Sequence, residues 1–267
     1  MRPLVVTGAI AGIVMLAAVG AGWAADRGSQ STTDLTREAA SGQAGAAYTL
    51  GMRYYDENGH HPDYKKAVHW LEIGAKAGDA QAQAQLGYIY QEGSGVPRDY
   101  ALARQWAARA AAQGDSAAMN QLGDLYLHGL GVKRDYVTAR SWFEKSAAKG
   151  NSTGQANLGW IYYNGLGVPK DCKKAVGYYE DSIRQDDPSG ENNMAVAHFF
   201  GCGTAQSDLA ALKWALIADK SVTMTPAKLT PANRRRVLRN IANLEQRMTP
   251  AAIAKAKDEA AQWRPAP

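Results

Sequence analysis

Residues 82–114 read AQAQLGYIYQEGSGVPRDYALARQWAARAAAQG, and this pattern decides the fold. Its first part places Ala82, Leu86 and Tyr90 at the spacing of one helical face. Its second part repeats this spacing with alanine and tryptophan, and a Gly-x-Gly segment separates the two parts. Small residues let helices approach closely, while aromatic rings fill the gaps between them. The stretch therefore predicts two packed helices joined by a glycine turn.

The same pattern recurs along the chain with a fixed period. Leu-Gly pairs recur every 36 residues, at 50–51, 86–87, 122–123 and 158–159. A degenerate fifth copy follows around Met194, and a half-copy that begins at Leu35 precedes the first. Such a period indicates stacked supersecondary units, none of which buries its apolar face alone. We therefore expect an all-α fold over residues 35–219, an α/α superhelical solenoid of about five 36-residue helix-turn-helix repeats.

Four of the five repeats carry a glycine pair, a feature that also occurs in phosphate-binding loops. The pairs are Gly93/Gly95, Gly129/Gly131, Gly165/Gly167 and Gly201/Gly203. A phosphate loop follows a β-strand and occurs once, whereas these pairs follow predicted helices in four successive repeats. An aspartate follows three of the pairs, at Asp99, Asp135 and Asp171. We therefore predict a helix end, a turn with positive φ and an aspartate that caps the next helix.

Residues Ser146 to Lys149 have the Ser-x-x-Lys spacing of a serine nucleophile and its lysine base. The equivalent positions of the preceding repeat are Ala110 to Gln113, so the spacing does not recur as a motif. The chain also lacks the Ser-Asp-Asn and Lys-Thr-Gly motifs that accompany such a serine. We expect no catalytic residues and no enzymatic activity.

The N-terminal residues 1–24 are typical of an export signal. Arg2 is followed by an apolar segment, and small residues precede a predicted cleavage site after Ala24. An uncleaved anchor is the alternative, because the apolar segment is long enough to span a bilayer. After the signal we expect a flexible linker over residues 25–34. The protein is then expected to be periplasmic or secreted, with no membrane insertion once the signal is removed.

Residues 220–267 depart from the repeat and are expected to form a helical cap. Thr230-Pro231 and Thr249-Pro250 each predict a helix start, which gives helices over about 232–247 and 250–263. Because the ends of a solenoid need covering, these helices are expected to close the last repeat.

The same C-terminal segment is strongly basic. It holds ten Lys and Arg and three acidic residues, and the whole chain has a net charge of +5. The segment therefore carries the basic character of the chain. Two interpretations are open: a solvated helix face, or contact with an anionic partner through Arg234, Arg235, Arg236 and Arg239. Nucleic acid is not an expected partner of an exported protein.

The repeat resembles the Sel-1-like repeat, a relative of the tetratricopeptide repeat. The shared pattern is Ala-x-x-x-Leu-Gly-x-x-Tyr, Gly-x-Gly-Val-x-x-Asp, Ala-x-x-Trp and Ala-x-x-Gly, which is clearest from Ala82 to Gly114 and from Ala118 to Gly150. The first copy departs from it at His60-His61-Pro62, and the fifth lacks Leu-Gly and Tyr. The resemblance implies a right-handed α/α superhelix that binds a protein or peptide in its concave groove.

In related tetratricopeptide superhelices, the first helix of each repeat lines the groove with the face opposite the Leu-Gly-Tyr core. Here that face lies two residues before and two, five and six residues after the repeated leucine. The partner-binding residues that this implies are Tyr88, Gln91, Asn120, Asp124, His128, Trp160, Tyr163, Asn164, Asn192 and Phe199. Aromatic rings beside amides are typical of protein interfaces, which favours Trp160 and Tyr163 within the set. Packing against the neighbouring helix is the alternative role for these two.

Cys172 and Cys202 are the two cysteines of the chain. Their even number and the expected export leave two interpretations open: a disulfide, or two independent small side chains. The His60-His61 pair lies near acidic residues but lacks the ligand spacing of a metal site. We expect no metal site and no cofactor.

These observations favour binding over catalysis. The leading hypothesis is an exported adaptor or regulator that binds a protein or peptide partner. A periplasmic immunity or inhibitor protein that blocks a toxic enzyme is the alternative hypothesis. An enzyme that acts on cell-wall material or β-lactams is the least favoured class.

Overall fold

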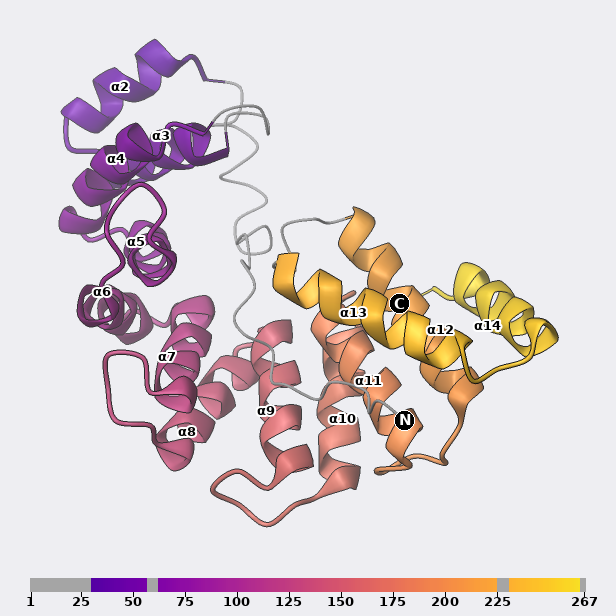
Figure 1. Ribbon diagram of the computed structural model, residues 1–267. Coiled ribbons are helices and arrows are strands. Elements are labelled where there is room, and N and C mark those ends of the chain that lie inside the picture. The colour runs from indigo at the N-terminus through magenta and orange to yellow at the C-terminus, as the bar shows by residue number, and fades with distance from the viewer. Residues whose placement is uncertain (1–29, 57–61, 225–230, 265–267) are drawn as a thin grey trace. The chain divides into compact units, whose positions relative to one another are not determined.

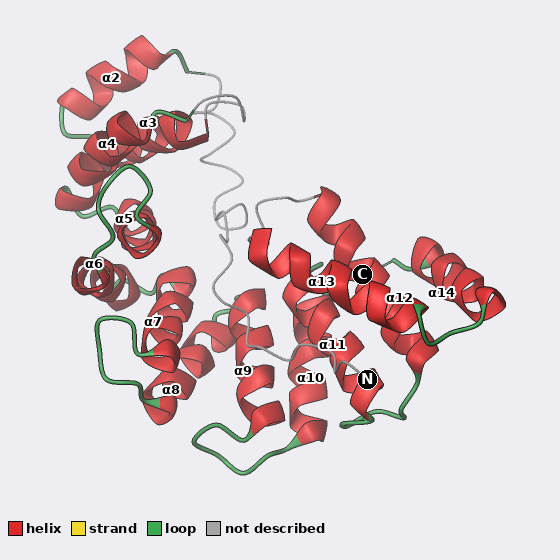
Figure 2. Cartoon of the chain, viewed as in Figure 1, coloured by secondary structure: helices red, strands yellow, loops and turns green. Residues whose placement is uncertain are grey.

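The structure is a computed structural model that describes residues 30–56, 62–224 and 231–264. Within these ranges the chain consists of helices and the loops between them, without a strand (Figure 2). The predicted all-α fold is therefore confirmed. The described residues form two compact units, an N-terminal unit over 30–135 and a C-terminal unit over 136–264.

The N-terminal unit contains six helices (Figure 1). They are α2 (Thr32–Ala40), α3 (Ala44–Asp56), α4 (Tyr64–Lys76), α5 (Ala80–Glu92), α6 (Tyr100–Ala112) and α7 (Ser116–His128). Helix α3 pairs with α4 and α5 pairs with α6, while α4 also packs on α5 and α6 packs on α7. Helix α2 begins inside the segment predicted as a linker, because the side chain of Ser31 caps it by accepting a hydrogen bond from the backbone N–H of Asp34.

The C-terminal unit contains the remaining seven described helices. They are α8 (Tyr136–Ala148), α9 (Ser152–Asn164), α10 (Cys172–Ile183), α11 (Pro188–Phe200), α12 (Asp208–Met224), α13 (Pro231–Glu245) and α14 (Pro250–Gln262). Helix α9 pairs with α10 and α11 pairs with α12. The two predicted C-terminal helices are present as α13 and α14, and both pack on α12. We call α3, α5, α7, α9 and α11 the first helices and α4, α6, α8, α10 and α12 the second helices.

Polar caps and glycine turns fix the ends of the first helices. The side chains of Asp79 and Asp115 accept hydrogen bonds from backbone N–H groups at the starts of α5 and α7. Helices α5, α7, α9 and α11 all end at a glycine in the left-handed conformation. Asp99 and Asp171 cap the second helices α6 and α10 in the predicted way. The glycine pairs are therefore structural elements of the repeat.

The second glycine of each pair also permits close packing. Gly131 has a φ of +65°, and a Cβ atom there would lie 2.6 Å from the Cβ atom of Tyr100 at the start of α6. A side chain at this position would strain the backbone and collide with the preceding second helix. The turn folds back onto α6 because glycine occupies the position.

The repeated leucines at 50, 86, 122 and 158 are buried in the cores of their units. Helix α5 approaches α6 closely at Gly87, where a Cβ atom would lie 3.1 Å from the carbonyl oxygen of Ala103. In the ranges that the structure describes, no helix combines the length and apolarity of a membrane span. The predicted export signal, residues 1–24, lies outside the described residues.

Candidate partner-binding surface

All ten residues predicted to line a groove lie on first helices. Four of them are partly or fully exposed: Tyr88, His128, Trp160 and Asn164. Six are buried within their units: Gln91, Asn120, Asp124, Tyr163, Asn192 and Phe199. The positions two residues before and five residues after the repeated leucine are therefore packing positions. The exposed members lie two or six residues after that leucine.

A polar network connects α5 and α7 beneath the surface of the N-terminal unit. Asp124 is fully buried, and its Oδ2 accepts a hydrogen bond of 3.2 Å from Nε2 of Gln91. The Oε1 atom of Gln91 accepts a hydrogen bond of 3.0 Å from Nε2 of Gln121. His128 lies one helical turn after Asp124, and its Nε2 is 3.3 Å from Oδ1 of that carboxylate. The network thus links a buried carboxylate to a histidine side chain that is 32% exposed.

The network alters the proton affinity of the groups at its edge. The hydrogen bond to Asp124 raises the pKa of His128, while partial burial and the charge of Arg134 oppose this shift. Burial raises the pKa of Glu92, and the Asp124 charge adds to that effect although Arg98 opposes it. Folding therefore makes His128 easier to protonate than it is in the unfolded chain.

This arrangement predicts a pH-dependent contribution of His128 to stability. A folded-state pKa above the unfolded value means that the contribution is fully present below about pH 6.5 and is lost as the pH rises through the folded pKa. Because the imidazole is partly solvated, we expect this contribution to the unfolding free energy to be only about 0.5 kcal/mol. Denaturant unfolding of the parent protein and of His128→Gln between pH 6 and pH 8 measures it. The difference in unfolding free energy between the two proteins should shrink as the pH rises, and a constant difference would contradict the assignment.

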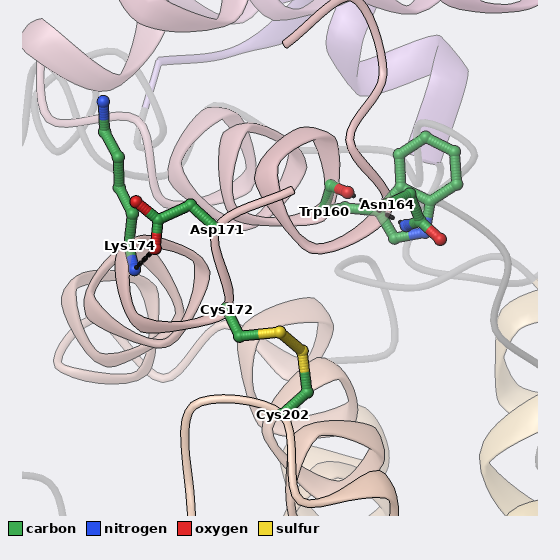
Figure 3. Close-up of a disulfide and its surroundings, with 6 residues drawn as sticks. All are labelled: Trp160, Asn164, Asp171, Cys172, Lys174 and Cys202. Atoms are coloured by element: carbon green, nitrogen blue, oxygen red, sulfur yellow. Dashed lines mark hydrogen bonds between the residues drawn. A yellow bond between two sulfur atoms is a disulfide. The ribbon is translucent and has the colours of Figure 1, made fainter. Parts of the chain in front are cut away.

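On α9 of the C-terminal unit, Asn164 is exposed and Trp160 is partly exposed. Nδ2 of Asn164 donates a hydrogen bond of 2.9 Å to the backbone oxygen of Trp160, and Figure 3 shows both side chains pointing away from the disulfide. Tyr163, which the sequence favours alongside Trp160, is buried, and Nζ of Lys170 lies 5.2 Å from the centre of its ring. Burial also raises the pKa of the Tyr163 hydroxyl. Tyr163 therefore packs in the interior, the alternative role that the sequence leaves open.

The C-terminal helices of the chain cover the predicted residues of the fifth first helix, α11. Nδ2 of Asn240 on α13 donates a hydrogen bond of 3.3 Å to Oδ1 of Asn192. The guanidinium carbon of Arg247 lies 4.8 Å from the centre of the Phe199 ring. Phe199 also belongs to a hydrophobic cluster with Leu244 of α13. Asn192 and Phe199 are thus occupied by contacts with the cap of their own chain.

The serine of the Ser-x-x-Lys match is not placed as a nucleophile. Ser146 on α8 is fully buried, at a point where Gly154 of α9 packs against it. Its hydroxyl is therefore out of reach of a substrate. Lys149, three residues later, is exposed directly after the end of α8.

Cys172 and Cys202 form a disulfide with Cα atoms 5.1 Å apart (Figure 3). It joins the start of α10 to the loop after α11, so it links adjacent repeats of the C-terminal unit. Of the two interpretations that the sequence leaves open, the structure contains the disulfide. No cluster of three His, Cys, Asp or Glu side chains suited to a metal ion occurs in the described part of the chain. His60 and His61 lie outside it.

Two features of the site are missing from the predicted set. Gln121, the residue just before the repeated leucine, belongs to the buried network. The preceding repeat also has a glutamine at this position, Gln85, and this recurrence in the sequence could have identified Gln121. Three lysines gather near the disulfide, at Lys170, Lys173 and Lys174. They come from a loop and the first turn of a helix, so no helical periodicity points to them.

Comparison with solved structures supports the repeat assignment. A Sel1 repeat protein from Oxalobacter formigenes aligns with a TM-score of 0.67 at 24% identity, covering 88% of this chain and 91% of that one. A Sel1 repeat protein from Klebsiella pneumoniae aligns with a TM-score of 0.54 at 21% identity, covering 80% of this chain and 98% of that one. At these identities the two likenesses show the fold alone.

A protective antigen of uropathogenic Escherichia coli strains, which displays an SLR fold, aligns with a TM-score of 0.61 at 29% identity. The alignment covers 85% of this chain and 56% of the antigen, so the chain spans little more than half of that protein. No match was found among curated proteins. The family model for the Sel1 repeat matches residues 44–79, 80–115, 116–151, 152–187 and 188–218. Five consecutive matches show that the chain belongs to the Sel1 repeat family.

Proposed function

We propose that the chain is an exported repeat protein that binds a protein or peptide partner through the exposed residues of its first helices, as an adaptor or regulator. Sel1 repeat proteins generally mediate protein–protein interactions. The observation that carries the proposal is the accessibility of four of the predicted residues: Tyr88 and Trp160, two residues after the repeated leucine, are partly exposed, and His128 and Asn164, six residues after it, are exposed.

The chemistry of these residues suits recognition of a polypeptide. Interfaces are enriched in aromatic side chains, and amide and imidazole groups supply hydrogen bonds that set the register of a bound chain. Tyr88 and His128 offer this combination in the N-terminal unit, and Trp160 and Asn164 offer it in the C-terminal unit. The buried hydrogen bonds below His128 hold its helices in place, which lowers the entropy cost of binding.

The location and the role of the protein belong to the same proposal. Residues 1–24 support export to the periplasm or beyond, and the burial of Ser146 supports binding without turnover. If the partner is a toxic enzyme, the protein is an immunity or inhibitor protein that uses the same residues for binding.

Affinity capture from cell-envelope extract tests the proposal. The baits are the parent protein, the double variant Trp160→Ala/Asn164→Ala and the matched control Trp142→Ala. Trp142 is also partly buried in the C-terminal unit, but it lies on the second helix α8, beneath Nζ of Lys145 at 4.1 Å from the ring centre. All three baits are first checked for equal helix content by circular dichroism.

We expect the parent and Trp142→Ala to retain the same amount of one protein. The double variant should retain at least about tenfold less of it, because loss of an aromatic side chain at the centre of an interface has an effect of this size. Equal retention by the double variant would place the binding surface elsewhere and overturn the proposal.

A further inference from the structure

Phe200, the last residue of α11, lies exposed at the end of a first helix. Its side chain is 44% exposed, and in the described part of the chain Val137 and Leu238 are the other large apolar side chains that are exposed. A single exposed apolar side chain is ordinary at a protein surface, and Val137 on α8 and Leu238 on α13 need no other explanation. Phe200 differs from these two residues in its position within the repeat.

The repeat gives Phe200 a position that is exposed on other first helices. It lies six residues after Met194, which occupies the position of the repeated leucine in the fifth copy. His128 and Asn164 also lie six residues after their leucines, and both are exposed. Helix α11 is in contact with α9, which carries Asn164. Phe200 therefore extends the exposed residues of α9 to the next first helix of the C-terminal unit.

Several contacts fix the backbone next to Phe200. Gly201 ends α11 in the left-handed conformation, and its backbone N–H donates a hydrogen bond to the backbone oxygen of Ala197. The backbone N–H of Cys202 donates a second hydrogen bond, of 2.9 Å, to the same oxygen. The disulfide then joins Cys202 to Cys172 at the start of α10. An aromatic side chain on a fixed backbone loses little conformational entropy when a partner binds.

The Phe200 ring packs against its buried neighbour Phe199. The two ring centres are 4.9 Å apart and the ring planes meet at 88°, which is an edge-to-face contact. The guanidinium carbon of Arg247 lies 4.8 Å from the centre of the Phe199 ring, and Nε of Arg247 donates a hydrogen bond of 3.2 Å to Oδ2 of Asp208. Because Asp208 balances the charge of Arg247, the cation that contacts this aromatic pair is already paired.

The loop after Phe200 contains no charged residue. Residues 201–207 read GCGTAQS, whereas the loops after α5, α7 and α9 read GSGVPRD, GLGVKRD and GLGVPKD. Each of those three loops holds a cation and an aspartate, and the loop after α11 has neither. A charged side chain of a partner would lose hydration at Phe200 without gaining an opposite charge from this loop. An apolar side chain would instead gain from burial against the aromatic ring.

We propose that Phe200 binds an apolar side chain of the polypeptide partner. This inference rests on the proposed function, because it takes the partner to be a protein or peptide that binds the first helices. It adds the chemistry of the residue that the partner presents to the C-terminal unit. The bound segment of the partner contacts Trp160 and Asn164 on α9 and places its apolar side chain against Phe200 on α11.

Selection of random peptides displayed on phage, with the oxidised protein as bait, tests the inference. Fluorescence anisotropy with a labelled copy of the most enriched peptide then gives its Kd for each variant. The test variant is Phe200→Asn, which introduces the residue type found at the equivalent position of the fourth repeat, and Phe200→Leu restores an apolar side chain. The matched control is Leu238→Asn, which changes a side chain of similar exposure on α13. Circular dichroism first checks that all variants are equally helical.

We expect the enriched peptides to share an apolar residue. Phe200→Asn should raise the Kd at least about tenfold, while Phe200→Leu and Leu238→Asn should stay within about threefold of the parent. Peptides without a common apolar residue, no enrichment at all, or equal affinities of the parent and Phe200→Asn would overturn the inference.

The double variant Trp160→Ala/Asn164→Ala separates this inference from the proposed function. If the peptide loses affinity for the double variant but not for Phe200→Asn, the partner surface stands and Phe200 is not part of it. If it loses affinity for Phe200→Asn alone, Phe200 binds the peptide and the proposed surface on α9 fails. Loss in both variants supports both proposals.

Discussion

Replacing Gly131 with valine is expected to lower the unfolding free energy by about 3 kcal/mol, the largest effect of a single substitution that we predict. Two causes act together. A β-branched residue at a φ of +65° is strained, and its Cβ atom would lie 2.6 Å from the Cβ atom and 3.1 Å from the backbone carbon of Tyr100. The turn can relieve the collision only by moving away from α6.

Lys133→Ala is the matched control for this prediction. Lys133 is exposed in the same loop, two residues after Gly131, so its truncation should change the unfolding free energy by less than about 0.5 kcal/mol. Urea denaturation of the two variants and the parent measures both effects. Equal midpoints for the two variants would show that the glycine turn is not required by the repeat.

Removal of the disulfide is expected to have the second large effect. Cys172 and Cys202 are 30 residues apart, and closing a loop of that length restricts the unfolded chain by about 3–4 kcal/mol on the chain-entropy account. Cys172→Ser/Cys202→Ser should therefore unfold at a lower denaturant concentration than the oxidised parent. The first elements to lose protection against hydrogen exchange should be α10 to α12, which lie next to the disulfide.

The reduced parent protein is the control for the serine variant. Reduction removes the same cross-link without changing another atom of the cysteines' surroundings, so the reduced parent and the serine variant should have the same stability. If reduction leaves the unfolding midpoint of the parent unchanged, the two cysteines do not stabilise the C-terminal unit in solution.

The helical repeat could be predicted because its signals are local. The Leu-Gly pairs and the Gly-x-Gly turns depend on neighbours within one repeat, and their recurrence gives the period of 36 residues. Gly93 ends α5 in the left-handed conformation, and Asp99 caps α6, as the spacing indicates. The cap helices also followed from local signals, since Thr249 accepts a hydrogen bond from the backbone N–H of Ala252 at the start of α14.

The candidate surface was harder to predict because its burial depends on other repeats. Gln91 is a polar residue of a type usually found at the surface, but it is buried. Its hydrogen-bond partners Asp124 and Gln121 lie 33 and 30 residues further along the chain. Asn192 is covered by Asn240, which is 48 residues away on the cap. Periodicity indicates which face of a helix a residue occupies, but only the packing of distant segments decides whether that face is open.

The disulfide shows the same limit. It joins the start of α10 to the loop after α11. The pairing was one of two interpretations of the sequence, because the spacing of two cysteines along the chain does not show whether their backbones meet.

Site-specific photo-crosslinking in cells tests most directly whether the first-helix surface binds a partner. A photoreactive amino acid is placed at Asn164 or His128, and at the exposed Lys149 or Lys133 as controls in the same two units. We predict that Asn164 and His128 give a crosslinked adduct with one protein and that the two lysine positions do not. Adducts from the lysine positions alone, or from none of the four, would contradict partner binding by this surface.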